Sequence, residues 1–343
     1  MELRPEDRDS KEQPRTLSNG QDIVIVNTAL IMKAMQNVQK AQADFQDLLE
    51  RAELGDTSLQ FDLGLRYASG DGVDVDMSQA FYWFGQAAES GDLRAIDALG
   101  RCYQNGDGVE ADPVRAAELY LQAAEQDYAP AQCNLGVCYL NGIGVETDPV
   151  QAAEWLRRAA DLGFARAQSI LGVCYENGTG VEQDPERAVE LYRQAADQGY
   201  APAMCNLGVC YLSGIGVETD PVQAVAWLQR SAALEFPRGQ SILADCYDSG
   251  TGVEADPTRA AELYRQAADQ GYPSAISSLG LCYEIGSGVE QDPVRAVELY
   301  RQAAEAGYVP AKCNLAVCCL NGIGMEADPV QAVKLLEEAA GEG

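Results

Sequence analysis

The heptapeptide NLGVCYL occurs twice in this sequence, at residues 134–140 and again at residues 206–212. A related heptapeptide, ILGVCYE, lies midway between them at residues 170–176, so the underlying period is 36 residues. Extended in both directions, this period divides residues 56–343 into eight consecutive units without remainder. Self-similarity at a fixed period of this length indicates a repeat architecture, in which every unit forms the same supersecondary structure.

The first half of each unit is predicted to form a helix, which we call helix A. A leucine recurs at residues 63, 99, 135, 171, 207, 243, 279 and 315, and a glycine or alanine follows it. Four residues after the leucine stands a tyrosine, replaced only by Cys319. Residues four apart share one face of a helix, and the small residue allows a neighbouring helix to approach closely.

A Gly-x-Gly-Val turn joins helix A to a second predicted helix, helix B. The third unit has this turn at residues 142–145. Its first glycine suits the left-handed conformation that ends many helices. Seven of the eight turns lead into Asp-Pro, as at Asp148 and Pro149. Aspartate caps a helix N-terminus and proline suits the first helical position, so helix B begins here.

Helix B is expected to bury one face against its neighbours. In the third unit this face is predicted to hold Ala152, Trp155 and Ala159, spaced by three and four residues. We expect aromatic residues to alternate along the array at the position of Trp155, namely Trp83, Trp155, Trp227, Tyr120, Tyr192 and Tyr264. A single helical hairpin cannot cover its own apolar face, so the units must stack into an all-α solenoid with one continuous core.

Composition restricts the functions that this chain can perform. Its 343 residues include 24 Lys plus Arg, 53 Asp plus Glu and no histidine, for a net charge of −29. Nucleic acids and anionic membranes attract clustered basic residues, so neither is expected as a partner, whereas a basic protein segment is compatible. Without histidine there is no imidazole base and no histidine metal ligand. We therefore predict a non-enzymatic protein without cofactor or metal.

The eleven cysteines all fall on helix A. Equivalent helices of stacked repeats lie ~8–10 Å apart, farther than the ~7 Å that a disulfide allows between Cα atoms. No CxxC pair suggests a zinc site. We expect free thiols packed as small apolar side chains, which indicates a reducing compartment and hence the cytoplasm.

The regions outside the regular repeats leave alternatives open. Residues 1–22 are polar and are predicted to be disordered, and the apolar stretch after them is too short to span a bilayer. Residues 23–55 are predicted to form one long helix, with a 3-4-spaced apolar seam at Ile31, Ala34, Val38, Ala41, Phe45, Leu48 and Ala52. This helix could cap the first repeat or form a homodimer through residues 23–52. The degenerate last repeat could end the array or dock a partner.

The quoted pattern resembles the Sel-one-like repeat, a longer relative of the tetratricopeptide repeat. The match rests on Leu135-Gly136, Tyr139, the glycine turn, Asp148 and the small residues of helix B, repeated in phase eight times. The resemblance implies a right-handed α/α superhelical solenoid with helix A lining the concave side. It also implies a role as a scaffold or adaptor in protein complexes.

In tetratricopeptide relatives the partner-binding groove is lined by helix-A positions three before, and one, four and five after, the glycine. By this resemblance the groove residues are Cys133, Val137, Leu140, Asn141, Val173, Glu176, Asn177, Val209, Leu212, Asp245, Asp248, Leu281 and Glu284. Asn134, Asn206 and Asn314 match an asparagine that binds a ligand carboxylate in some relatives, although the accompanying lysines are absent.

Along this set, repeats with apolar residues alternate with repeats that carry acidic or polar residues, so the pattern has a period of two repeats. The alternation favours a peptide segment with alternating apolar and basic side chains, or it records duplication of a 72-residue pair. The rival functions are a self-assembling structural protein, which would use the N-terminal helix and the open C-terminal repeat, and an enzyme of the hydrolase type.

Overall fold

The computed structural model describes residues 28–342, so the predictions for residues 1–22 and for the first five residues of the N-terminal helix lie outside it. Within this range the chain is helical throughout and contains no strand. The elements are α1 (Thr28–Glu53), η1 (Thr57–Leu59), α2 (Gln60–Ser69), α3 (Met77–Glu89), α4 (Leu93–Asn105), α5 (Pro113–Ala124), α6 (Ala129–Asn141), α7 (Pro149–Asp161), α8 (Ala165–Asn177), α9 (Pro185–Asp197), α10 (Ala201–Ser213), α11 (Pro221–Ala233), α12 (Pro237–Ser249), α13 (Pro257–Asp269), α14 (Pro273–Ile285), α15 (Pro293–Glu305), α16 (Val309–Asn321) and α17 (Pro329–Glu342).

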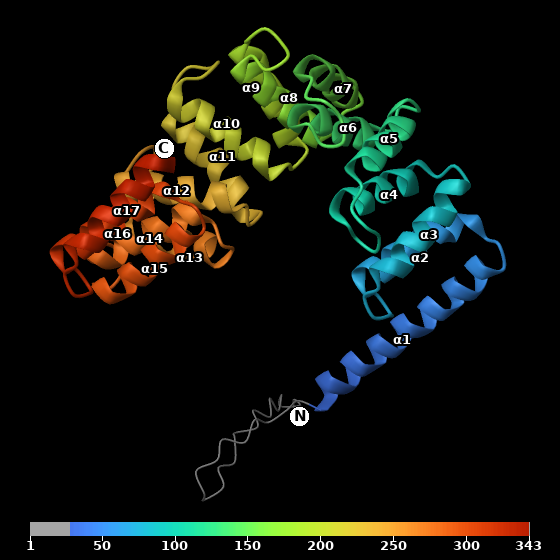
Figure 1. Ribbon diagram of the computed structural model, residues 1–343, viewed down its shortest axis with the longest axis horizontal. Coiled ribbons are helices and arrows are strands. Elements are labelled where there is room, and N and C mark those ends of the chain that lie inside the picture. The colour runs from blue at the N-terminus through green and yellow to red at the C-terminus, as the bar shows by residue number, and fades with distance from the viewer. Residues whose placement is uncertain (1–27, 343) are drawn as a thin grey trace, which may run out of the picture. The chain divides into compact units, whose positions relative to one another are not determined.

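The even-numbered helices from α2 to α16 are the predicted helices A, and the odd-numbered helices from α3 to α17 are the helices B (Figure 1). The described residues form two compact units, residues 28–111 with α1 to α4 and residues 112–342 with α5 to α17. In the second unit every helix packs against the next one along the chain. The prediction of an all-α solenoid built from eight helical hairpins is confirmed.

The leucine ladder forms the core, as predicted. All eight of its leucines are buried, and Leu63 and Leu207 have no exposed surface at all. In the second unit the small residue beside the leucine is needed because helix B of the same hairpin lies directly over it. A Cβ atom on Gly136 would approach Leu156 Cγ to 2.8 Å, and one on Gly208 would approach Leu228 Cγ to 2.7 Å.

The second glycine of each turn is required for stacking rather than for the turn alone. A side chain on Gly144 would collide with the main-chain carbonyl of Pro113, the first residue of the preceding helix B. The same collision recurs between Gly180 and Pro149, one repeat later. Each turn therefore rests on the N-terminus of the helix B before it.

The expected aromatic alternation at one position of helix B is wrong. Trp155 is half-buried, whereas Leu156, the next residue, is fully buried. The tryptophan and tyrosine sets occupy two adjacent positions, and a helix turns by about 100° per residue, so the two positions face different surroundings. Tyr192 stands at the buried position, while Trp155 lies nearer the surface, with the guanidinium of Arg158 4.5 Å from the centre of its ring.

Aspartates begin the helices B, as the Asp-Pro pattern predicts. The Asp148 carboxylate accepts hydrogen bonds from the amides of Val150 at 3.1 Å and Gln151 at 3.0 Å. Hydrogen bonds from Gln151 lower the pKa of Asp148, because they favour the charged carboxylate.

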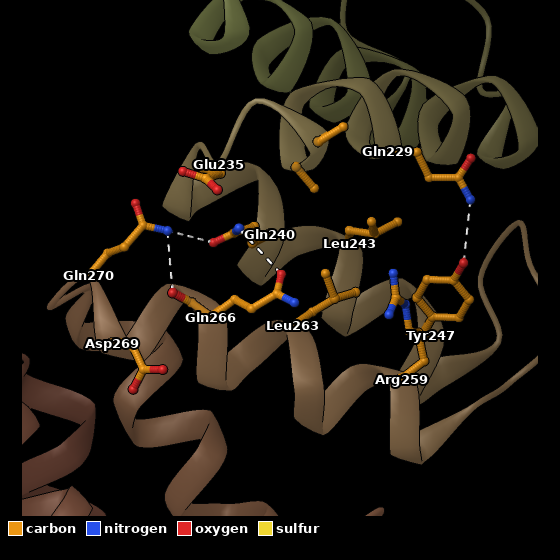
Figure 2. A pocket seen from close by; sticks show the side chains of 12 residues that line it. Gln229, Glu235, Gln240, Leu243, Tyr247, Arg259, Leu263, Gln266, Asp269 and Gln270 are labelled. Carbon is orange, nitrogen blue, oxygen red and sulfur yellow. Dashed lines mark hydrogen bonds between the residues drawn. The ribbon is translucent and has the colours of Figure 1, made fainter. Parts of the chain in front are cut away.

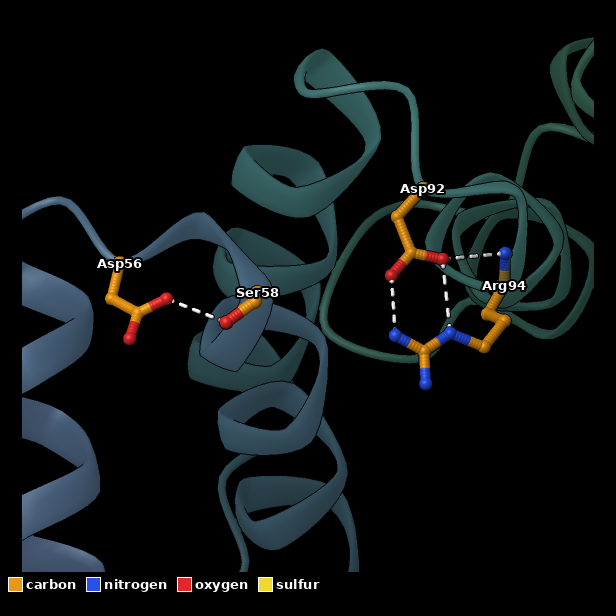
Figure 3. A network of polar contacts seen from close by, with 4 residues as sticks. All are labelled: Asp56, Ser58, Asp92 and Arg94. Atoms are coloured by element: carbon orange, nitrogen blue, oxygen red, sulfur yellow. Dashed lines mark hydrogen bonds and ion pairs between the residues drawn. The ribbon is translucent and has the colours of Figure 1, made fainter.

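Two further aspartates precede helices A in the first unit (Figure 3). Asp56 accepts a hydrogen bond from the Ser58 hydroxyl, which lowers the pKa of Asp56. Burial raises the pKa of Asp92, but hydrogen bonds from the Arg94 guanidinium and main-chain amide outweigh it and lower the pKa. These contacts fix the start of the first two hairpins.

Helix α1 occupies the place of a helix B in front of the first repeat. Phe45 and Ala52 are buried beside Leu63 and Trp83. A side chain on Gly72 would strike the carbonyl of Ala41, 31 residues earlier, just as Gly144 faces Pro113. Because α1 has 26 residues and α3 only 13, its N-terminal half extends beyond the contacts that a helix B makes.

Candidate protein-binding face

The helices A of the second unit present a surface that we call the A-helix face. It consists of the positions one, four and five residues after the glycine position in α6, α8, α10, α12, α14 and α16. Twelve of the thirteen predicted groove residues fall on these positions. Val137, Leu140, Glu176, Val209, Leu212 and Glu284 are half-buried, and Asn141, Val173, Asn177, Asp245, Asp248 and Leu281 are exposed.

Cys133 is the exception, because its side chain is completely buried. It packs in a core cluster with Leu156 and Leu171. The same position, three residues before the glycine, is buried in the following repeats at Ser169 and Cys205. Because repeats stack through this position here, Cys133 offers no surface to a partner. The prediction that Cys133 lines the groove is therefore wrong.

The half-buried acidic residues of the A-helix face are held by tyrosines from helix B. The Tyr192 hydroxyl donates a hydrogen bond to Glu176 at 2.6 Å, and Tyr300 donates one to Glu284 at 2.7 Å. Burial is the first cause that raises the pKa of Tyr192, and the neighbouring carboxylate adds to it. The tyrosine partners of Glu176 and Glu284 could not be identified from a spacing of three or four residues, because each contact joins helix A to helix B across the hairpin.

This pairing explains the alternation along the A-helix face. Where helix B carries a buried leucine, as at Leu156, helix A carries Leu140 sixteen residues before it. Where helix B carries Tyr192, helix A carries Glu176. A buried hydroxyl needs a hydrogen-bond partner and a buried leucine does not, so the two-repeat alternation has a cause inside the hairpin.

Repeat six differs, because it places two carboxylates on the A-helix face. The Tyr264 hydroxyl donates to Asp245 at 2.6 Å, one position after the alanine that replaces glycine. Desolvation of the Asp245 carboxyl raises its pKa, the tyrosine hydroxyl opposes this, and the charge of Asp248 raises it further. Asp248, three residues later, is exposed and carries the second negative charge.

Two of the three asparagines of the suggested carboxylate site accept hydrogen bonds from arginines of the next repeat, whereas Asn314 donates one to the Ser277 hydroxyl at 3.3 Å. Arg166 donates a hydrogen bond to the Asn134 side-chain oxygen at 2.8 Å, and Arg238 donates one to Asn206 at 2.6 Å. These bonds link consecutive helices A within the second unit. They explain why Asn recurs at a 72-residue interval together with arginine 32 residues further on.

Sequence reasoning missed an apolar area on α14 and α16, two helices A that contact each other. Ile285 is 61% exposed, Val317 48% and Leu320 53%, and Leu281 beside them is 47% exposed. These residues occupy the same columns as the predicted set in repeats seven and eight. The signal was present in the sequence, and extending the mapping through both repeats would have found it.

Each of the eleven cysteines is a free thiol, and all but Cys313 are buried. Burial raises the pKa of Cys138 to about 11 and that of Cys210 to about 12. Within residues 28–342 no cluster of three or more Cys, Asp or Glu side chains could hold a metal ion. None of the helices in the described range has an apolar stretch that could cross a lipid bilayer.

These observations define the chain as an α-helical hairpin repeat protein with a variable A-helix face. Comparison with protein families shows a Sel1 repeat at residues 58–92, 93–128, 129–164, 165–200, 201–236, 237–272, 273–308 and 309–343. The chain belongs to the Sel1 repeat family. Repeats of this type generally mediate protein–protein interactions, and the family's solenoids are typically non-catalytic scaffolds.

Two solved structures are similar at both the sequence and the structural level. One is c5321, a protective antigen of uropathogenic Escherichia coli strains with an SLR fold, at 36% identity and a TM-score of 0.65. That match covers 87% of this chain and 64% of c5321, so the chain spans less than two thirds of its relative. The other is a Sel1 repeat protein from Oxalobacter formigenes, at 32% identity and a TM-score of 0.64, with coverage of 71% of this chain and 96% of that one. No curated protein sequence shows a significant match.

Proposed function

We propose that this protein is a non-enzymatic scaffold or adaptor whose A-helix face binds a segment of a partner protein. The observation that carries the proposal is the composition of that face in the second unit. Val137, Val173 and Val209 follow one another at the position after the glycine, and Asp245 continues the column. All four side chains are exposed or half-buried, although their neighbours on the same helices form the core.

The chemistry of the face favours a segment that carries apolar and basic side chains. Valine and leucine side chains supply apolar area that a partner can cover. Asp245 and Asp248 supply two negative charges that orient a basic side chain and accelerate its association. The net charge of −29 adds a long-range attraction for basic segments, which weakens as salt is added.

A charge reversal on the A-helix face tests this proposal. Affinity purification with the wild-type chain, followed by mass spectrometry, identifies partners, and each partner segment is then measured as a purified peptide. Asp245→Lys with Asp248→Lys should weaken binding by about tenfold or more, which corresponds to ~1.4 kcal/mol. The matched control is Glu218→Lys with Glu254→Lys, which changes the net charge equally in two exposed turns. Equal binding by the two double variants would remove the A-helix face from the proposal.

A second candidate, self-association through α1, is favoured by the exposed half of that helix. Met32 is 62% exposed, Met35 59% and Val38 56%. Val38 belongs to the apolar seam that buries Phe45, and Met35 lies beside that seam. We propose that two copies pair along this seam. Light scattering across concentration should show a dimer that Met35→Glu with Val38→Glu dissociates. The control, Gln36→Glu with Ala43→Glu, places the same charges on the other side of α1. A monomer at all concentrations ends this candidate.

We also propose that the protein works in a reducing compartment such as the cytoplasm. Buried free thiols persist there, whereas oxidising compartments favour disulfides. The eleven unpaired cysteines support this assignment. Oxidised thiols in protein isolated under non-reducing conditions would contradict it.

A further inference from the structure

A groove lies on the surface formed by the helices B of the second unit, which we call the B-helix face, between α11 and α13 and with helix A α12 as its floor (Figure 2). Its volume is about 690 Å³. It shares no residue with the A-helix face, because helix A contributes different positions to the two faces. The residues that line it include Glu235, Leu243, Tyr247, Arg259, Leu263 and Asp269.

The groove is open because two wall residues of α11, Gln229 and Ala233, are uncharged and smaller than the residues at the same positions of neighbouring helices B. Helices α7, α9 and α13 have an arginine at the position of Gln229 and an aspartate at the position of Ala233. One repeat further on, the corresponding groove has Arg265 and Asp269 in this wall and a volume of about 310 Å³. Repeat five thus lacks both charged side chains that narrow the equivalent groove.

Glu235 at the mouth of the groove has an unfavourable backbone conformation. Its φ is 57°, in the left-handed region, and glycine stands at this position in the neighbouring repeats, at Gly199 and Gly271. Glycine adopts this conformation without strain, whereas glutamate does not. The mouth of the groove therefore carries a carboxylate at a cost in backbone strain, where the neighbouring repeats carry glycine.

The groove has a polar direction along its length. Glu235 and Asp269 lie at one end, Leu243 and Leu263 in the middle, and Arg259 with Tyr247 at the other end (Figure 2). Residues 259 and 269 are ten apart on one helix, or about 15 Å. An extended segment of four to five residues covers that length at ~3.3 Å per residue.

The walls also provide side-chain amides that match a peptide main chain. Gln229 donates to the Tyr247 hydroxyl at 3.3 Å, and Gln270 donates to the buried Gln240 at 2.9 Å. A glutamine amide carries both a donor and an acceptor, as a peptide group does. The glutamines can therefore pair with an extended main chain while the ends of the groove select charged side chains.

We propose that the groove between α11 and α13 binds an extended segment of a partner protein with the pattern basic-x-apolar-x-acidic. Alternate side chains of an extended segment point to the same side. The basic side chain therefore lies between Glu235 and Asp269, the apolar one over Leu243 and Leu263, and the acidic one at Arg259. The site is independent of the A-helix face.

Fluorescence anisotropy with labelled peptides and the full chain tests the proposal. The probe is a peptide pool with arginine, then any residue, then leucine, isoleucine, valine or methionine, then any residue, then glutamate. The control pool places the arginine and the glutamate next to each other, so its composition is unchanged but its two charges cannot reach opposite ends of the groove in either chain direction. The probe pool should bind at least about fivefold more tightly than the control pool, or ~1 kcal/mol. Equal binding of the two pools overturns the proposal.

Filling the groove is the decisive substitution, because the neighbouring repeats already carry the introduced residues. Gln229→Arg with Ala233→Asp should preserve the fold and reduce probe binding about tenfold. Asp245→Lys with Asp248→Lys on the A-helix face should leave binding of the probe within about twofold. The proposal fails if the filled variant binds as the wild type does, or if only the A-helix variant loses binding. Neither failure bears on the A-helix face as the site of other partners.

Glu235→Gly separates binding from stability. Glycine relieves the backbone strain, so the melting temperature should rise, while loss of the carboxylate should weaken binding of the probe pool. Asp127→Gly is the matched control, because Asp127 has a φ of 58° at the equivalent position of another repeat. It should leave the affinity unchanged, while its effect on the melting temperature combines relief of strain with loss of the hydrogen bond that Asp127 accepts from Gln132 Nε2 at 3.4 Å. Unchanged affinity in Glu235→Gly would exclude the carboxylate from the site.

Discussion

Leu162→Gln should repair an unsatisfied hydrogen-bond acceptor inside the third repeat. In the other repeats of the second unit, the residues at the positions equivalent to 132 and 162 are of matching kinds, either both polar or both apolar. The Gln198 side chain donates to Gln168 at 2.8 Å, and Gln270 donates to Gln240 at 2.9 Å. In the last repeat, Lys312 donates to Glu342 at 2.7 Å.

Gln132 breaks this rule, because its counterpart is Leu162. The Gln132 side chain is 0% exposed, and its Nε2 donates to the carbonyl of Ala124 at 3.1 Å. Its Oε1 has no hydrogen-bond partner among the described residues. The backbone at Leu162, with φ −78° and ψ 2°, is close to that of Gln198, with φ −83° and ψ 1°. A glutamine at position 162 can therefore reach Gln132 as Gln198 reaches Gln168.

The size of the effect follows from a comparison with Leu234→Gln. Leu162 is 55% exposed and Leu234 54% exposed, so each substitution loses a similar apolar contact, ~1 kcal/mol. The residue 30 positions before Leu234 is Met204, which offers no amide oxygen. A buried acceptor without a partner costs ~1–3 kcal/mol. Leu162→Gln should therefore be ~1–2 kcal/mol more stable than Leu234→Gln.

Urea denaturation followed by circular dichroism measures this difference. Because long repeat arrays can unfold in parts, amide hydrogen exchange in α6 and α10 should be measured alongside it. Protection of α6 should increase in Leu162→Gln, whereas protection of α10 should not increase in Leu234→Gln. Equal stability of the two variants would show that Gln132 Oε1 is satisfied in solution and that the pairing rule is wrong.

Three further predictions concern packing, thiol chemistry and pH. Gly239→Ala alone should destabilise the chain by ~1–3 kcal/mol, because the new Cβ would collide with the hydroxyl oxygen of Ser231. Ser231→Ala with Gly239→Ala, the pair found in neighbouring repeats, should restore stability in the same urea assay, and no rescue would refute the steric argument. Alkylation by iodoacetamide at pH 8 should be slow for the buried thiols of the folded chain, because burial raises the pKa of seven of them to about 11 or 12. All eleven cysteines should react after denaturation without reductant, and markedly fewer would contradict the free-thiol assignment. Hydrogen bonds to helix amides lower the pKa of Asp148 and Asp220 in the folded chain, so their stabilisation is complete above the unfolded value of about 3.9 and is lost as the pH falls through the lower folded values. Asp148→Asn with Asp220→Asn should reduce the loss of stability between pH 7 and pH 3, and an unchanged loss would show that these caps do not drive it.

The features that depend on residues near one another in the chain could be predicted from the amino-acid sequence. The 36-residue period, the Leu-Gly-x-x-Tyr helix, the glycine turn and the Asp-Pro cap are local signals, and each predicted its element correctly. The leucine ladder was predicted for the same reason, because a spacing of four residues defines one face of a helix.

The tertiary structure decided which side chains of these helices remain accessible. Cys133 is buried by the next repeat, Glu176 is held by Tyr192 across its hairpin, and Asn134 is held by Arg166 of the following helix A. These contacts join residues 16 to 38 positions apart, and helical periodicity carries no information about them. The groove between α11 and α13 likewise depends on Gln229 and Ala233 of α11 and on the charged residues of α13. Only the stacking of repeats brings these side chains together.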